Sequence, residues 1–257
     1  IGGSHIQSNV CHSYLNLSST ENQVQSSHIE QLVKAASQGP LSDDRTAVQV
    51  IPLEFSVDQQ ISVRNPKGMT ARRLDGYVQV VSASAQAHNN VRAVINRAGV
   101  VVEETVFEAF AAAHAVLEEQ EREMGVVVAD LGAASVDLVA YLEDDLRLAT
   151  GIALGGDHFI NDVAEVLRTS RGAAQVLIAQ YGSAIAAGTP PNVTIEVPSL
   201  GDEGTTAHPR RLLNEILEAR AQEVFELVGK ELERTRLQGR LIGGMVLAGA
   251  LACLPGI

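Results

Sequence analysis

The sequence contains no tryptophan, and aromatic residues make up only 4% of its 257 residues. The core must therefore be built from alanine, valine, isoleucine and leucine, which is typical of α/β layers. Cysteine is scarce, since Cys11 and Cys253 lie almost a whole chain apart. This excludes a disulfide framework and favours two reduced thiols. The seven histidines are scattered without ligand spacing, so we expect no zinc site.

Positive charge is also in short supply. Nineteen lysines and arginines face 31 aspartates and glutamates, which gives a net charge of -12 and a pI near 5.0. An acidic chain without a basic stripe repels phosphate groups, so we expect no nucleic-acid partner and no electrostatic attraction to anionic lipid. A hydrophobic content of 46% with a mean hydropathy of +0.08 indicates a globular protein.

The two ends and one uncharged run need separate interpretation. No secretory signal peptide is visible. Ile1–Ser4 reads as the end of a strand and Leu254–Ile257 as a loop inside a domain, so we expect a chain truncated at both ends. The uncharged run 241–257 is glycine-rich and slightly short for a membrane span. We expect a buried strand, Met245–Ala248, followed by a glycine turn.

The first part of the chain has the texture of a small α+β module. Its pattern predicts one helix with apolar residues at helical spacing, and short strands on either side of it. The predicted elements are a helix at 28–36 and strands at 48–51, 54–57 and 77–81. Pro52 is expected to separate the first two strands.

From Ser82 onward strands and helices alternate. We expect the following elements: helix 85–98, a short strand from 100–102, helix 108–117, a charged loop or helix end at 118–123, and a three-stranded meander at 125–131, 136–142 and 146–154. After it we expect a helix at 161–167 opened by Gly155-Gly156-Asp157, helical residues at 168–182, a strand at 193–197 and a long amphipathic helix at 209–236.

Six short stretches carry a resemblance. Asp130-Leu131-Gly132-Ala133-Ala134-Ser135-Val136-Asp137 is similar to the D-[IL]-G-G-G-T-T-D turn of actin-like ATPases. Leu154–Ala164 resembles the glycine–aspartate turn and helix of the bacterial FtsA family, and Val246–Ile257 resembles its adenosine motif V-L-T-G-G-G-A-x-L-P-G-I. Gly3–Ser8, Val50–Asp58 and Asn65–Met69 resemble the SHS2-like domain inserted in that family.

The resemblance implies an actin-like ATPase (ribonuclease H-like) two-domain α/β fold with an inserted small α+β module. We expect the inserted module at 1–78, the remainder of the first actin-like domain at 79–124 and the second actin-like domain at 125–257. An outer subdomain is expected at about 169–238. The inserted module separates this chain from MreB-type and DnaK-type proteins.

The resemblance also implies a nucleotide site for ATP with Mg. Its cofactor-binding residues would be Asp130, Gly132, Ala133, Ala134, Ser135, Asp137, Gly155, Gly156, Asp157, Gly249, Ala250 and Leu251, with Asp130 organising the metal. Glycine lets backbone N–H groups approach phosphate, and a carboxylate organises a hydrated cation. Each residue type also has a structural reading, because aspartates cap backbone amides and glycines serve turns.

The departures from the family pattern point to a weakened site. The run G-G-G-T becomes Gly132-Ala133-Ala134-Ser135, and Ala250-Leu251 replaces two glycines of the adenosine motif. Gln175 and Ile178 stand where the family has a glutamate and a lysine that reach the nucleoside. We therefore expect weakened nucleotide binding and at most a weak or degenerate ATPase.

By resemblance the function is that of an FtsA-type division scaffold. Such proteins link the FtsZ ring to the cytoplasmic face of the membrane at the septum, self-associate into actin-like filaments and contact later division proteins. The FtsZ contact is expected in the subdomain around 172–236. The C-terminal amphipathic membrane helix of the family is missing here, so this chain alone is not expected to bind membrane. The alternatives are an active ATPase or kinase of the actin-like superfamily, or a PilM-like adaptor of a pilus machine.

Overall fold

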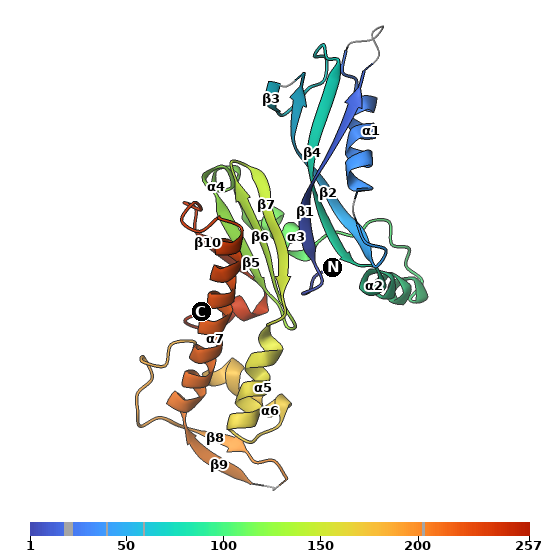
Figure 1. Cartoon of the computed structure of the whole chain (residues 1–257). Coiled ribbons are helices and arrows are strands. Elements are labelled where there is room, and N and C mark those ends of the chain that lie inside the picture. Colours follow the sequence, from blue (N-terminus) through green and yellow to red (C-terminus); the bar gives the residue numbers. More distant parts are fainter. Residues whose placement is uncertain (18–22, 40, 59, 202–203) are drawn as a thin grey trace.

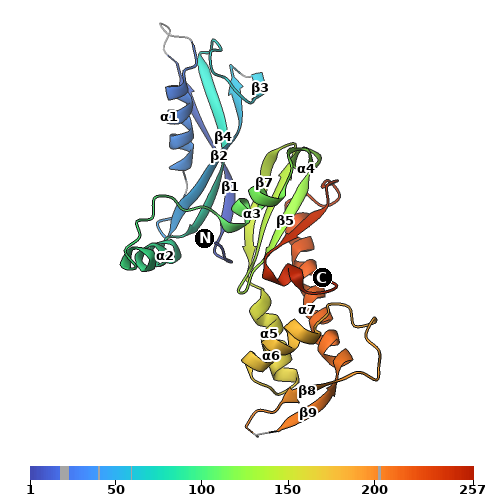
Figure 2. The same cartoon turned by 180° about the vertical axis from the view of Figure 1, so that it is seen from behind.

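The computed structural model describes residues 1–257 except 18–22, 40, 59 and 202–203, and its elements form three groups along one long axis (Figure 1). A four-stranded sheet with one helix lies at one end, and a second four-stranded sheet lies in the middle. Helices and a two-stranded sheet form the other end. Seen from behind, helix α3 (Glu108–Val116) lies between the two larger sheets (Figure 2).

The first sheet has the strand order β1-β4-β2-β3 with antiparallel neighbours. Helix α1 packs on one face through Leu32 and Ala36, which meet apolar residues of β2 and β4. On the other face, Val81 and Ala83 pack against the middle sheet and α3. The elements of this part are β1 (Gln7–Asn16), α1 (Ser26–Ser37), β2 (Arg45–Val57), β3 (Gln60–Val63) and β4 (Arg73–Ser84).

The expected break at Pro52 is wrong. A single strand, β2, runs through this proline, and its register against β4 shifts between Pro52 and Glu54. Strand β3 pairs with β2 only at Phe55 and Val57, so on that side no described strand needs an N–H from residue 52. Proline is tolerated at such an edge position or bulge.

The middle sheet has the order β10-β5-β6-β7 and confirms the predicted meander. Its last strand joins from the far end of the sequence, since β10 pairs with β5 in parallel. One face packs on Phe107 and α3, and the other on helices of the third group. The elements here are α4 (Glu119–Met124), β5 (Val126–Leu131), β6 (Val136–Leu142), β7 (Asp145–Ile152), β10 (Met245–Ala248) and the 3-10 helix η1 (Ala250–Cys253).

The third group is built around a long amphipathic helix. The buried stripe of α7 includes Leu213, Leu217, Val224 and Val228, which share one core with Phe159 of α5. Strand β9 is an element that the sequence did not indicate. The bounds are α5 (Gly156–Val166), α6 (Arg171–Tyr181), β8 (Thr194–Pro198), β9 (Thr205–Pro209) and α7 (Arg210–Arg234).

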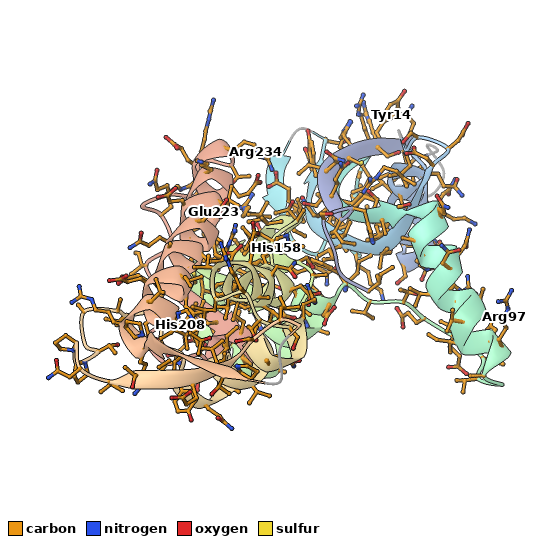
Figure 3. The ribbon with its side chains drawn as sticks, turned by 90° about the horizontal axis from the view of Figure 1, so that it is seen from below. Tyr14, Arg97, His158, His208, Glu223 and Arg234 are labelled. Carbon is orange, nitrogen blue, oxygen red and sulfur yellow. The ribbon has the colours of Figure 1, made fainter. Side chains whose placement is uncertain are left out.

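Helix α2 (Ala85–Arg97) confirms a predicted helix, but none of its residues is buried. Val91 and Val94 are 45% and 66% exposed, and Figure 3 shows α2 projecting from the body with Arg97 near its outer end.

The described residues 100–102 and 1–4 form no strand, contrary to expectation. Strand-forming residues need a neighbouring strand, and 100–102 have none among the described elements. No helix in the described part of the chain is long and apolar enough to cross a membrane.

Candidate functional site

A tight turn joins the two central strands β5 and β6. The Gly132 N–H donates to the carbonyls of Ser135 and Asp130, at 3.0 and 3.1 Å. The side chains of Ala133 and Ala134 are exposed at the tip of this turn. The turn therefore presents two methyl groups beside its backbone.

The N-terminus of α5 is hydrogen-bonded to this turn. The Gly156 N–H donates to the Gly132 carbonyl at 2.9 Å, and the Asp157 N–H donates to the Ala133 carbonyl at 2.8 Å. The Gly155 N–H donates to Nδ1 of His158 at 3.1 Å. The first amides of the helix thus bond to the protein itself.

Two of the candidate glycines are explained by packing. A Cβ at Gly155 would lie 2.6 Å from the Ala133 oxygen and 2.7 Å from the Ser135 nitrogen. A Cβ at Gly249, whose φ is +86°, would lie 2.5 Å from Oδ1 of Asp130. Real Cβ atoms do not approach so closely, so both positions require glycine whatever binds nearby. A Cβ at Gly156 would meet nothing closer than 3.6 Å.

These elements border a cleft of about 640 Å³ between the β5–β6 turn, α5, α6 and η1. The candidate residues that line it are Gly132, Ala133, Gly156, Asp157, Ala250 and Leu251. One face of helix α6 also lines the cleft. The motifs pointed to Gln175 and Ile178 on this face but missed Arg171 and Gly172. The helical spacing of 171, 175 and 178 was the available signal, because residues so spaced share one face.

The other candidate residues are not part of the cleft lining, and the best defined of them is Asp137. This residue is 4% exposed, and its carboxylate accepts the Gly3 N–H with both oxygens at 3.0 Å. Burial, together with the nearby Glu108 and Asp130 carboxylates, raises the pKa of Asp137 to about 6 although the Gly3 bond lowers it. Asp130 lies beside Gly249, while Ala134, Ser135 and Gly155 belong to the turn and its contact with α5.

Charge at the cleft mouth is balanced by one ion pair. Nη2 of Arg171 lies 2.8 Å from Oδ1 of Asp157, and both side chains are about half exposed. Within the described residues, no cluster of three or more His, Cys, Asp or Glu side chains is placed to hold a metal. A cation beside Asp130 would therefore depend on water and ligand oxygens, as Mg²⁺ often does.

Two family profiles match the chain. The profile described as "SHS2 domain inserted in FTSA" matches residues 3–82, and "Cell division protein FtsA" matches residues 127–256, half of the chain. The chain belongs to the FtsA family. The inserted module and the later actin-like part thus follow each other as in that family.

Curated FtsA proteins align along nearly the whole sequence. The Pseudomonas aeruginosa protein is 32% identical over 256 residues, which is 100% of this chain and 61% of that protein. The Escherichia coli K12 protein is 29% identical over 93% of this chain and 58% of its own length. The Streptococcus pneumoniae protein is 34% identical over 89% of this chain and 50% of its own length. The chain therefore spans about half to three fifths of the length of these relatives.

Solved structures of actin-like proteins share the fold. MreB5 of Spiroplasma citri bound to ADP superposes with a TM-score of 0.54, covering 67% of this chain and 56% of that chain, at 19% identity. The PilM-PilN type IV pilus biogenesis complex gives a TM-score of 0.57 over 95% of this chain and 60% of that chain, at 16% identity. The FtsA-family chain thus has an actin-like two-domain fold with an inserted module.

Apolar side chains, one exposed amide and one paired arginine line the cleft of this FtsA-family chain. Ile160, Ile178 and Leu251 give it apolar walls, and the exposed amide of Gln175 offers hydrogen bonds. The amides at the start of α5 are already bonded, and Arg171 is paired with Asp157. The donors at the start of α5 and the guanidinium of Arg171 are therefore engaged within the protein.

Proposed function

We propose that this protein acts as an FtsA-type division scaffold, linking FtsZ filaments to the cytoplasmic face of the membrane at the septum and self-associating into actin-like filaments. The observation that carries the proposal is the family match itself, with the inserted module at 3–82 and the FtsA profile at 127–256 in one chain. Membrane contact would run through the family's C-terminal amphipathic helix.

We assign partners to the parts of the fold. The module at 1–78 would contact a neighbouring subunit or later division proteins. Residues 79–124 would complete the first actin-like domain, and 125–257 would form the second. The outer subdomain at about 169–238 would hold FtsZ. The described part of that subdomain carries exposed apolar side chains, such as Val176 and Leu200 at 52% and 64%, which a bound FtsZ filament would cover.

We further propose that ATP with Mg binds this cleft more weakly than in other family members, and that ATP turnover is weak or absent. MreB5 has been solved with ADP and with AMPPNP, which supports a nucleotide in the corresponding cleft. The residues proposed to line or support it are Asp130, which would organise the metal, and Gly132–Ser135, Asp137, Gly155–Asp157 and Gly249–Leu251. Alanines in the phosphate turn and the engaged α5 amides argue against an active kinase.

Binding to FtsZ tests the scaffold. Assembled FtsZ filaments should pellet the protein, and hydrogen exchange should slow within 169–238 when filaments are added. Protection confined to residues 1–78 would move the FtsZ contact to the inserted module. If the protein stays in the supernatant at every FtsZ concentration that forms filaments, the linking role is rejected.

A PilM-like adaptor is the second candidate, because the PilM-PilN complex superposes over 95% of the chain. The two candidate functions differ in the protein that would be bound. Capture of a PilN peptide with no capture of FtsZ would favour the adaptor, and capture of FtsZ alone would favour the division scaffold.

A further inference from the structure

We propose that the cleft between the β5–β6 turn and α6 recognises the nucleoside end of its ligand and gains little affinity from phosphate groups. The inference rests on the proposed nucleotide cleft, and it concerns which part of the ligand is bound. It predicts that adenosine binds about as tightly as ATP.

The first support is the apolar side of the cleft, which would contact the base of a nucleoside. Ile178, Leu251 and Ile160 line the cleft while packing on the core that surrounds Phe159. Such half-buried aliphatic side chains present flat apolar surface, which is what the faces of a purine contact. Gln175 is exposed on the same helix as Ile178 and supplies both an amide donor and a carbonyl acceptor.

The second support is the hydrogen bonding of the glycine-rich segment. A helix N-terminus binds phosphate through free amides. Here the amides of Gly156, Asp157 and His158 donate to the carbonyls of Gly132, Ala133 and Gly155. A phosphate at this end of α5 would have to break bonds that already exist, so little net stabilisation remains.

The turn itself offers poorer access than a run of glycines. The Gly132 amide donates to Ser135, which leaves the amides of residues 133–135. The exposed methyl groups of Ala133 and Ala134 stand beside those amides. A phosphate oxygen must pass these methyl groups, which are not hydrogen-bond donors and which hinder close approach.

The third support is charge. Arg171 is the cationic side chain of the described cleft lining, and its guanidinium already pairs with Asp157. Behind the turn lie the carboxylates of Asp130 and Asp137, with Glu108 near both. A triphosphate would add several negative charges next to these groups in a protein of net charge -12. Repulsion offsets the attraction that Arg171 alone can provide.

Ligand titrations test the inference directly. Dissociation constants of adenosine, ADP and ATP, each with and without Mg²⁺, are measured by saturation-transfer NMR or calorimetry on the unsubstituted protein. We expect the three values to agree within about threefold. A value for ATP with Mg²⁺ that is tenfold or more below that of adenosine overturns the inference, and so does the absence of adenosine binding at millimolar concentration.

A variant sharpens the test. Asp157→Asn removes the carboxylate that pairs with Arg171, so the freed guanidinium should raise the ratio of ATP affinity to adenosine affinity about tenfold. The matched control is Glu215→Gln, which breaks the equally exposed Arg211–Glu215 pair on α7, outside the cleft lining. An Asp157→Asn protein whose ATP-to-adenosine ratio equals that of the control contradicts the role given to the ion pair.

The inference and the proposed function fail in different ways. Loss of FtsZ pelleting with equal adenosine and ATP affinities rejects the scaffold and keeps the inference. FtsZ pelleting together with a strong preference for ATP over adenosine keeps the scaffold and rejects the inference.

Discussion

The carboxylate of Asp137 in β6 holds the backbone N–H of Gly3 between its two oxygens, each 3.0 Å from the nitrogen. The contact requires small residues around it. A Cβ at Gly2 would collide with Oδ2 of Asp137, and a Cβ at Gly151 would collide with the Gly3 carbonyl. The start of the chain and the middle sheet are therefore joined at a buried carboxylate.

The first prediction concerns pH. Burial raises the pKa of Asp137 to about 6, above the 3.8 of an unburied aspartate, so between these values the folded protein binds a proton that the unfolded chain has released. Asp137 therefore favours folding at low pH, and this contribution is lost as the pH rises through 6. Asp137→Asn removes the buried charge. The variant should be more stable than the unsubstituted protein at pH 7.5, by on the order of 1–3 kcal/mol.

Urea unfolding at pH 5, 6 and 7.5 measures this difference. The gain of Asp137→Asn should shrink toward pH 5, because the native carboxyl is then protonated. Titrating groups that lie away from Asp137 cancel, since both proteins contain them. A stability difference that is constant across the three pH values would contradict the expectation.

The second prediction separates two adjacent glycines. Gly155→Ala should destabilise the protein by about 2–4 kcal/mol, since its Cβ would press on the turn backbone at Ala133 and Ser135. Gly156→Ala should be neutral or slightly stabilising, because it lies in the first turn of α5 with room for a methyl group. Thermal or urea unfolding of the two variants compares them. Equal costs at both positions would show that the turn can move away from α5.

The third prediction concerns a buried amide in α7. Asn214 is 0% exposed; its Nδ2 donates to Oγ1 of Thr189 at 2.6 Å and its Oδ1 accepts the Ser183 N–H at 2.9 Å. Asn214→Leu leaves that N–H without its acceptor, which typically costs about 1–3 kcal/mol. The Ser183 amide should also exchange with solvent faster. Gln222→Leu, on an exposed position of the same helix, is the control and should change neither quantity.

The middle sheet was predictable because its pattern is local and strong. The strand Val126–Leu131 is buried along almost all its length, which gives a continuous apolar run, and two short turns separate it from its neighbours. Helix α7 was predictable for the same reason, since its apolar stripe recurs over 25 residues.

The wrong strand predictions share a physical cause. Each depends on a neighbouring strand that the residues of the segment itself do not reveal. Pro52 suggested a break, but its edge position tolerates the missing N–H. Residues 100–102 have strand composition but no adjacent strand in the described structure. Thr205–Pro209 lacks an apolar alternation, yet it pairs with β8.

The candidate site was predicted in part. Motifs placed Gly132, Ala133, Asp157 and Leu251 in one region, and the structure brings them to one cleft. The motifs said nothing about Arg171, because an ion pair across α5 and α6 depends on how the two helices pack. Nor could they reveal that Asp137 bonds to the first residues of the chain.

Strand β10 has a consequence for biosynthesis. Met245 pairs with Val127. Strand β5 therefore has no partner on this side until all the residues up to β10 have left the ribosome. Non-local parallel pairing of this kind folds slowly, and an uncovered hydrophobic edge invites pairing with other nascent chains. A chain that ends before residue 245 would leave the buried, apolar strand β5 as an edge strand of the central sheet.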